Sequence, residues 1–368
     1  MYKLLFPLLQ QIDPEVLHNG ARDLARIAGK TPLKGLVSAL YRFEDERLRQ
    51  EYFGLTFQNP VGLAAGFDKY GAFIDIVPSL GFGFMELGSI SAQPRLGNPQ
   101  PRLFRLPKDH AIINRMGLNN DGAEATKNML LKRAGDRPVP LGISIVKTHD
   151  PNILGDAAVA DFVKSYTQLA PLADYLALNI SCPNTLEGKT FEDPQALEQL
   201  LQGIATAKEQ LQAEHQHVPP LFVKISPDRT DSELVHLIEV CKRFAVDGYI
   251  LTNTTTTRDN LQTPQVKLHE IGMGGLSGAP LFERSLRMIQ MVRTIAPSAF
   301  IVGVGGVQSA ADAYAMICAG ASLIQIYTGL IYHGPALVKQ INQGVLRHLE
   351  SDGFATLSDA IGSKKMHA

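Results

Sequence analysis

The chain has few cysteines and no excess of charge of either sign. Its three cysteines, Cys182, Cys241 and Cys318, are far apart in the sequence, and no two of them form a metal-type pair. A disulfide framework and a metal site are therefore not expected, and a reducing compartment is favoured. Cys241 and Cys318 lie in apolar, helix-like runs and are expected in the core. With 35 basic and 36 acidic residues the net charge is −1, which gives no electrostatic reason to expect a nucleic-acid partner.

Long hydrophobic runs are also missing. No segment reaches the roughly 18 apolar residues of a membrane-spanning helix. The short apolar run at the N-terminus is interrupted by Pro7, which is not typical of a signal peptide. These absences do not exclude attachment to a membrane surface. The 368 residues, 45% apolar and 19% charged, indicate an ordinary globular protein, long enough for one large barrel and a small appendage.

Residues 1–42 have a helical pattern of their own. Leucines from Leu4 to Leu9 recur at helical spacing, and Asp13-Pro14-Glu15 is typical of a capped helix start. Basic residues exceed acidic ones in this segment. An amphipathic, basic helical hairpin suits an anionic bilayer surface. The alternative is a helical flap packed on the main domain, and the pattern leaves both interpretations open.

From Gly54 onward, short apolar runs typical of strands alternate with helical segments. This alternation predicts parallel strands joined by crossover helices. Eight such repeats predict an α/β fold, a (β/α)8 TIM barrel over residues 43–368, beside a small N-terminal helical domain over residues 1–42. The competing architecture is a doubly wound open sheet, but its glycine-rich dinucleotide fingerprint is missing. The predicted strands are 61–65, 83–87, 141–146, 175–180, 221–225, 248–251, 300–304 and 323–327.

Small, polar or cationic residues follow nearly every predicted strand, where the chemistry of such a barrel is found. Gly305-Gly306 after the seventh strand and Tyr327-Thr328 after the eighth match the usual phosphate site of the fold. Lys224 ends an apolar strand, and a lysine that points into a barrel mouth needs an anion or an electron-rich ring. Beside a phosphorylated flavin it would stabilise negative charge on the reduced ring. The alternatives are turn glycines and a surface lysine.

Asn179-Ile180-Ser181-Cys182-Pro183-Asn184 is the densest cluster of polar groups after a strand. Such a cluster suits a site that binds a planar polar ring and removes a proton beside it. Cys182 is the candidate base, since a free thiol has a pKa of about 8.5 and accepts a proton more readily than a hydroxyl. Lys69 suits a substrate carboxylate or an ion pair with Asp68. The loop 114–120 suits a ligand with several donors and acceptors, or a turn and helix cap.

Taken together, these motifs resemble those of the dihydroorotate dehydrogenases, and specifically the class 2, quinone-dependent and membrane-associated branch. The resemblance covers nearly the whole chain, and Asp13-Pro14-Glu15 with His18 is similar to the N-terminal extension of class 2. The segments that carry it are 64–69, 101–106, 113–117, 179–184, 252–255, 275–278 and 303–306.

The resemblance implies an FMN oxidoreductase that converts (S)-dihydroorotate to orotate in pyrimidine biosynthesis and passes the electrons to a membrane quinone. Cys182 would be the catalytic base, and His18, Arg105 and Tyr327 would line the quinone site. The implied FMN contacts are Ala65, Gly66, Ser89, Ser144, Asn179, Lys224, Thr252, Gly278, Gly306, Tyr327 and Thr328. The implied substrate contacts are Lys69, Asn114, Arg115, Met116, Gly117, Leu118, Asn179, Asn184, Asn253 and Thr254. We expect peripheral contact with the cytoplasmic face of the inner membrane through residues 1–42, and no partner subunit.

Three residues depart from the class 2 pattern. Cys182 stands where class 2 has serine, Leu118 where phenylalanine is usual, and Ser144 where asparagine is usual. The chain is therefore interpreted as a variant of this enzyme, or as a paralogue that acts on another dihydropyrimidine or reduces fumarate or another soluble acceptor. A third possibility is a non-catalytic barrel that binds a phosphorylated ligand for regulation. A colourless protein that cannot be loaded with FMN would favour this last one.

Overall fold

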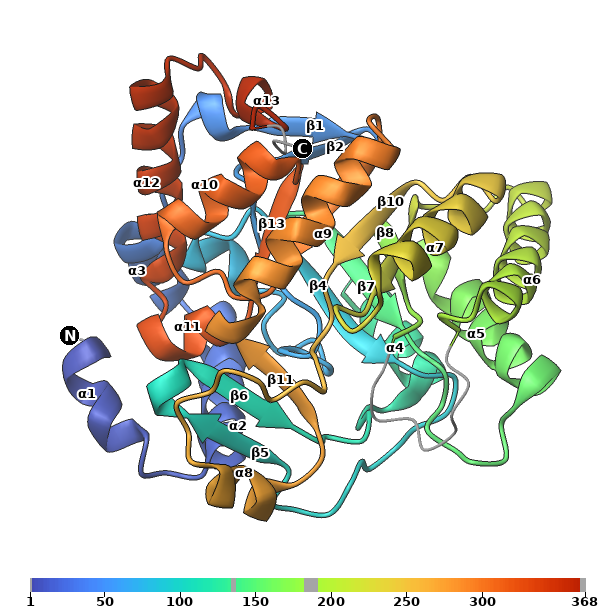
Figure 1. Ribbon diagram of the computed structural model, residues 1–368, viewed down its shortest axis with the longest axis horizontal. Coiled ribbons are helices and arrows are strands. Elements are labelled where there is room, and N and C mark those ends of the chain that lie inside the picture. Colours follow the sequence, from blue (N-terminus) through green and yellow to red (C-terminus); the bar gives the residue numbers. More distant parts are fainter. Residues whose placement is uncertain (1, 134–136, 182–190, 365–368) are drawn as a thin grey trace.

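Eight parallel strands close into a barrel at the centre of the molecule (Figure 1). The computed structural model describes residues 2–133, 137–181 and 191–364. The strand order around the barrel is β10-β12-β13-β3-β4-β7-β8-β9, which confirms the predicted (β/α)8 fold and excludes an open doubly wound sheet. The strands are β3 (Val61–Leu63), β4 (Phe84–Ile90), β7 (Leu141–Ile145), β8 (Tyr175–Asn179), β9 (Leu221–Ile225), β10 (Gly248–Leu251), β12 (Phe300–Val304) and β13 (Leu323–Ile326).

Aromatic side chains fill one end of the barrel. Tyr175 stacks on Phe222 with ring centroids 4.9 Å apart, and Phe222 stacks on Phe300 at 5.1 Å. The ring of Tyr175 also covers Gly142, where a Cβ atom would lie 2.0 Å from Tyr175 Cζ, so this position accepts glycine alone. An antiparallel hairpin of β1 (Gln50–Tyr52) and β2 (Leu55–Phe57) packs against the same end. The polar side chains lie at the opposite end of the barrel, where the strands finish.

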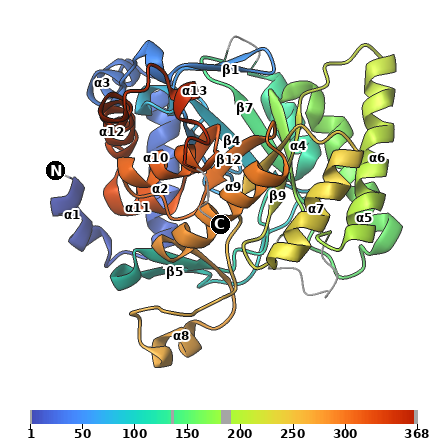
Figure 2. The same ribbon diagram turned by 45° about the horizontal axis from the view of Figure 1, so that its top comes forward.

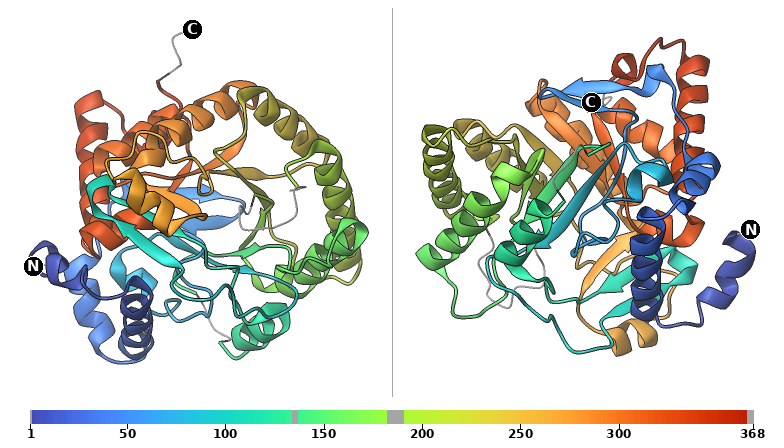
Figure 3. Two further views of the ribbon diagram at one scale, coloured as in Figure 1. Left: turned by 60° about the horizontal axis from the view of Figure 1, so that its bottom comes forward. Right: turned by 180° about the vertical axis from the view of Figure 1, so that it is seen from behind.

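Helices surround the barrel, as Figure 2 and the left view of Figure 3 show. Parallel strands covered on both faces are apolar throughout, which explains the continuous apolar runs in the sequence. Cys241 and Cys318 are fully buried in two of these helices, which confirms that they are core residues. The helices are α4 (Gly122–Leu131), α5 (Gly155–Leu169), α6 (Pro194–Ala213), α7 (Asp231–Arg243), α8 (Gln265–Ile271), α9 (Phe282–Ile295), α10 (Ala310–Ala319), α11 (Thr328–His333), α12 (Leu337–Asp352) and α13 (Leu357–Ala360).

A second, antiparallel sheet lies beside the mouth of the barrel. Its strands are β5 (Leu103–Leu106), β6 (Ala111–Asn114) and β11 (Gly275–Gly278), in the order β11-β6-β5. The sequence pattern did not predict this sheet. The strands are only four residues long, and β11 pairs with a strand more than 150 residues earlier. A local sequence pattern therefore does not predict them.

Three helices precede the barrel: α1 (Tyr2–Leu9), α2 (Pro14–Gly29) and α3 (Leu33–Tyr41). Asp13 caps α2 by accepting hydrogen bonds from the backbone N–H groups of Glu15 and Val16, as the sequence predicted. Glu15 forms a mostly buried ion pair at 2.6 Å with Arg102, which directly precedes β5. The pair ties α2 to the antiparallel sheet, beside which α2 lies in the right view of Figure 3. In the described part of the chain, no helix is long and apolar enough to cross a membrane.

Candidate functional site

A cavity opens where the barrel strands end, bounded on one side by the antiparallel sheet. It brings together residues that are far apart in the sequence. Of the predicted cofactor contacts it is lined by Ala65, Gly66, Ser89, Asn179, Lys224, Thr252, Gly278, Gly306, Tyr327 and Thr328. Of the predicted substrate contacts it is lined by Lys69, Asn114, Met116, Leu118, Asn179, Asn253 and Thr254. Leu103, Ile112 and Gln325 also line the cavity but were not selected from the sequence.

Glycines shape the part of the cavity near β12 and β13. Gly305 and Gly306 have positive φ angles of 119° and 82°. A Cβ atom on Gly306 would lie 2.6 Å from the backbone nitrogen of Phe282, so only glycine lets the two backbones approach. The hydroxyls of Ser277 and Thr328 lie 2.8 Å apart beside this turn. Close-packed backbone N–H groups and hydroxyls of this kind suit a phosphate group.

A hydrogen-bonded chain crosses the floor of the cavity. Ser144 Oγ and Ser89 Oγ are 2.8 Å apart, and Asn179 Nδ2 donates to Ser89 Oγ at 2.9 Å. Asn253 Nδ2 then donates to Asn179 Oδ1 at 3.1 Å and to Ser181 Oγ at 3.0 Å. Ser144 therefore does not line the cavity itself but holds Ser89, which does.

Lys224 is the cation of the cavity floor. It is 6% exposed, and burial lowers its pKa while the nearby charge of Glu86 raises it. Its ammonium group has no hydrogen-bond partner within the described residues. A buried ammonium facing a cavity calls for an anionic or electron-rich ligand.

Lys69 and Asp68 have separate roles. The carboxylate of Asp68 accepts three backbone N–H groups, from Tyr70, Ala72 and Phe73. Lys69 Nζ instead donates to Asn119 Oδ1 at 2.8 Å, and Lys69 lines the cavity.

Two predicted substrate contacts lie away from the cavity lining. Arg115 stacks over the ring of Phe104 at 4.6 Å and donates to the carbonyl of Pro101, so it braces the β5–β6 hairpin. Gly117 occupies a turn with a φ of 68°. Cys182 and Asn184 lie outside the described residues.

A second, apolar cavity of about 220 Å³ lies between the N-terminal helices and the barrel. It contains the three predicted quinone-site residues His18, Arg105 and Tyr327, together with Tyr2 and Phe67, which the sequence interpretation did not select. The His18 ring packs edge-on against Phe67 with centroids 5.0 Å apart, and burial lowers the pKa of His18. Tyr327, Leu103 and Ile112 line both cavities, so the two cavities adjoin at these residues.

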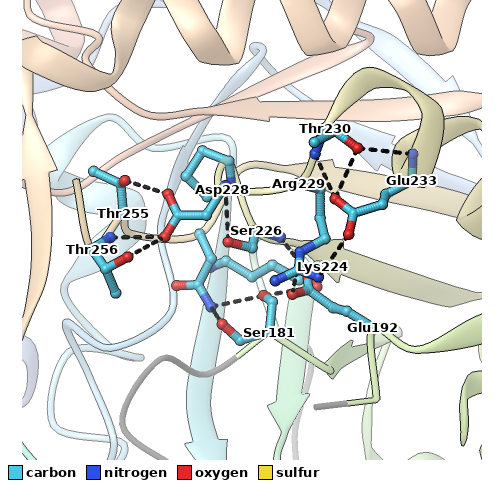
Figure 4. A network of polar contacts seen from close by, with 12 residues as sticks. Ser181, Glu192, Lys224, Ser226, Asp228, Arg229, Thr230, Glu233, Thr255 and Thr256 are labelled. Atoms are coloured by element: carbon cyan, nitrogen blue, oxygen red, sulfur yellow. Dashed lines mark hydrogen bonds and ion pairs between the residues drawn. The ribbon is translucent and has the colours of Figure 1, made fainter. Parts of the chain in front are cut away.

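Figure 4 shows a polar network beside the cavity, which no sequence motif predicted. The carboxylate of Asp228 accepts hydrogen bonds from Thr256 N and Thr256 Oγ1, both at 2.8 Å, and from the hydroxyl of Thr255. It thereby secures the segment that follows Asn253 and Thr254. Glu192 accepts from Ser226 N at 2.7 Å and lies 3.3 Å from Arg229 Nε.

Glu192 makes stability depend on pH. Burial raises its pKa from 4.5 to about 7, although the Ser226 N–H and Arg229 lower it. Between these two values the folded chain holds a proton that the unfolded chain has lost, so stability falls as the pH rises through this window. The shift corresponds to a loss of roughly 3 kcal/mol of folding stability across this pH window. We expect the free energy of unfolding to fall less between pH 4.5 and about pH 7 in Glu192→Gln than in the parent, as measured by urea unfolding at both pH values. Equal losses in both proteins would contradict this assignment.

Known proteins are similar to this chain in sequence. A family model described as dihydroorotate dehydrogenase matches residues 47–349. The chain is 43% identical over 365 residues to dihydroorotate dehydrogenase (quinone) of Natronomonas pharaonis, covering 98% of this chain and 99% of the relative. This chain belongs to the dihydroorotate dehydrogenase family. A further member, dihydroorotate dehydrogenase (quinone) of Roseiflexus sp. strain RS-1, is 41% identical over 364 residues and covers 98% of each chain.

Solved structures of the family share the fold. The structure of Eimeria tenella DHODH in complex with ferulenol superimposes with a TM-score of 0.85 at 35% identity, over 95% of each chain. The ligand-free form from the same organism gives a TM-score of 0.84 at 34% identity. Both matches extend over 95% of this chain.

Proposed function

We propose that this protein is an FMN-dependent dihydroorotate dehydrogenase that oxidises (S)-dihydroorotate to orotate and reduces a membrane quinone, within pyrimidine biosynthesis. The observation that carries the proposal is the pair of adjoining cavities. The first, the polar cavity, is the more polar of the two and is lined by Lys69, Lys224 and three asparagines, whereas the second is apolar. Tyr327 lies between them, which suits an enzyme with a polar reductant and an apolar oxidant. Relatives named dihydroorotate dehydrogenase (quinone) support the same assignment.

The residues at the strand ends fit FMN. Gly305, Gly306 and Thr328 would hold its phosphate, because the glycine turn leaves room for an anion against the backbone. Lys224, Ser89 and Asn179 would hold the polar edge of the ring. When bound, the flavin would supply the hydride acceptor for the substrate and the electron donor for the quinone.

The substrate site follows from the remaining groups of the polar cavity. Lys69 would bind the carboxylate of dihydroorotate, and the amides of Asn114, Asn179 and Asn253 would bind the amide and imide edges of its ring. Cys182 would take the proton from C5, while the hydride is lost from C6, so that the C5–C6 bond becomes a double bond. Asp228 supports this arrangement by securing the segment that follows Asn253.

The N-terminal helices would form the contact with the membrane. They expose Leu8, Leu24, Ile27, Leu36 and Leu40, each more than half accessible to solvent. Apolar side chains gathered on one part of a surface are typical of a lipid or protein contact, and the basic excess of residues 1–42 suits anionic lipid. The apolar cavity beneath these helices would admit the quinone. We assign the protein to the cytoplasmic face of the inner membrane, as a peripheral protein.

Anaerobic mixing of the purified protein with dihydroorotate tests the proposal. We expect the flavin absorbance to bleach quickly and a quinone analogue to restore it, whereas fumarate and NAD do not. A flavin-loaded protein that stays oxidised would point to another dihydropyrimidine. A protein that cannot be loaded with FMN at all would support the regulatory barrel instead.

Lys69→Met is expected to raise the KM for dihydroorotate roughly 10- to 100-fold, because a hydrogen bond to a charged group is lost. The flavin spectrum should not change, since Lys69 is assigned to the substrate. Steady-state kinetics with a soluble quinone analogue measure the effect. An unchanged KM would remove Lys69 from carboxylate binding.

A further inference from the structure

The eight barrel strands carry one acidic and one basic side chain, Glu86 on β4 and Lys224 on β9. Both point into the barrel. Phe84 and Phe222, two residues before each of them, belong to the interior aromatic cluster, and side chains two apart on a strand share a face. Glu86 is fully buried and Lys224 is 6% exposed. A lone charge at such a depth costs several kcal/mol, so the presence of one charge of each sign indicates a pair.

Glu86 is held by groups that donate hydrogen to it. Its Oε2 accepts from Gln325 Nε2 at 2.8 Å and from Tyr175 Oη at 3.1 Å. Both groups donate to the same oxygen, an arrangement that suits a carboxylate, which is an acceptor only. Its Oε1 is buried and has no hydrogen-bond partner within the described residues. One oxygen is thus fixed by neutral groups, and the other remains for a cation.

Gln325 links Glu86 to the cavity. Its side chain donates to Glu86 and also lines the cavity with Lys224. The carboxylate therefore lies directly behind the cavity floor. Within the described barrel interior, the other titratable side chain near Glu86 is Tyr175, whose pKa is raised well above its usual value by burial and then by the charge of Glu86. Tyr175 is therefore a neutral donor, and Glu86 is the acidic group whose charge acts on Lys224.

We propose that Glu86 is a positioning residue for the cofactor site, with its carboxylate behind the cavity floor as the counter-charge of Lys224. This inference rests on the proposed binding of FMN in that cavity, and it does not depend on which substrate the enzyme oxidises. Glu86 keeps the ammonium of Lys224 charged and directed toward the cavity, where Lys224 would hold the polar edge of the flavin ring. The contact with Gln325 at 2.8 Å keeps the carboxylate in place.

A double-mutant cycle on Glu86→Gln and Lys224→Met tests the pair. Melting temperatures of the FMN-free proteins and FMN dissociation constants, from fluorescence titration, are the readouts. Each single variant should melt roughly 5 °C or more below the parent, because it leaves one buried charge without its partner. The double variant should recover most of that loss. Glu86→Gln should weaken FMN binding roughly tenfold in the parent, and by less than about twofold once Lys224 is replaced.

Tyr175→Phe is the matched control, since it removes a hydrogen bond to Glu86 without changing either charge. Its FMN affinity should stay within about twofold of the parent. Additive losses in the cycle, an unchanged or tighter FMN affinity in Glu86→Gln, or a control as weak as Glu86→Gln would each overturn the proposal. If Glu86→Gln does not fold, a folded double variant supports the pair and an unfolded one refutes it. None of these readouts uses dihydroorotate, so the failure of the substrate assignment would be seen separately.

Discussion

Cys182→Ala is expected to slow flavin reduction by dihydroorotate by a factor of roughly 10² to 10⁴, the range typical of losing a general base. Without the thiolate, the proton on C5 has no acceptor at the site. FMN and orotate binding should stay close to the parent, because Lys224, Lys69 and the asparagines remain. Anaerobic stopped-flow absorbance measures the reductive half-reaction, and titration with orotate measures binding.

Two further variants make this result specific. Cys182→Ser should retain part of the activity with its optimum at higher pH, since a hydroxyl is a weaker proton acceptor than a thiol near neutrality. Cys318→Ala changes a buried thiol in α10, remote from the cavity lining, and should keep normal flavin reduction. Normal reduction in Cys182→Ala would remove Cys182 from the role of base. An unchanged pH profile in Cys182→Ser would argue against a thiol-specific mechanism.

Removal of residues 1–42 is expected to abolish reduction of a long-chain quinone and binding to liposomes, while dihydroorotate still reduces the flavin. Tyr2 and His18 belong to the wall of the apolar cavity, and the exposed leucines belong to the same helices. The polar cavity takes its lining from the barrel and the antiparallel sheet, so it survives the deletion. Full-rate reduction of a long-chain quinone by the shortened protein would mean that these helices are only a flap.

A full-length variant separates membrane contact from loss of the cavity wall. Leu24→Asp with Ile27→Asp places two charges on the exposed side of α2, where the parent side chains are 69% and 58% exposed. We expect liposome binding to fall sharply while a water-soluble quinone analogue is still reduced. Leu131→Asp is the matched control, because Leu131 is 52% exposed at the end of α4. Equal liposome binding by both variants would contradict a membrane contact through α2.

The sequence by itself determined the barrel and most of the cavity lining. Parallel strands buried on both faces must be apolar along their whole length, so their runs are visible in the chain. The strands of a barrel all end on one face, so the residues that follow them, such as Asn179, Lys224 and Gly306, must converge. The Asp13 cap was likewise visible, because a helix start depends on a few adjacent residues.

Tertiary structure alone decided the contacts between distant residues. The β5-β6-β11 sheet joins segments more than 150 residues apart. The Gln325 contact with Glu86, the Asp228 contacts with Thr255 and Thr256, and the place of Tyr327 between two cavities also depend on which side chains the closed barrel brings together. Local periodicity reports which face of an element is buried, but not which polar group it meets there. In the sequence, Glu86 is therefore an isolated acidic residue in an apolar strand, and its contact with Gln325 forms only in the closed barrel.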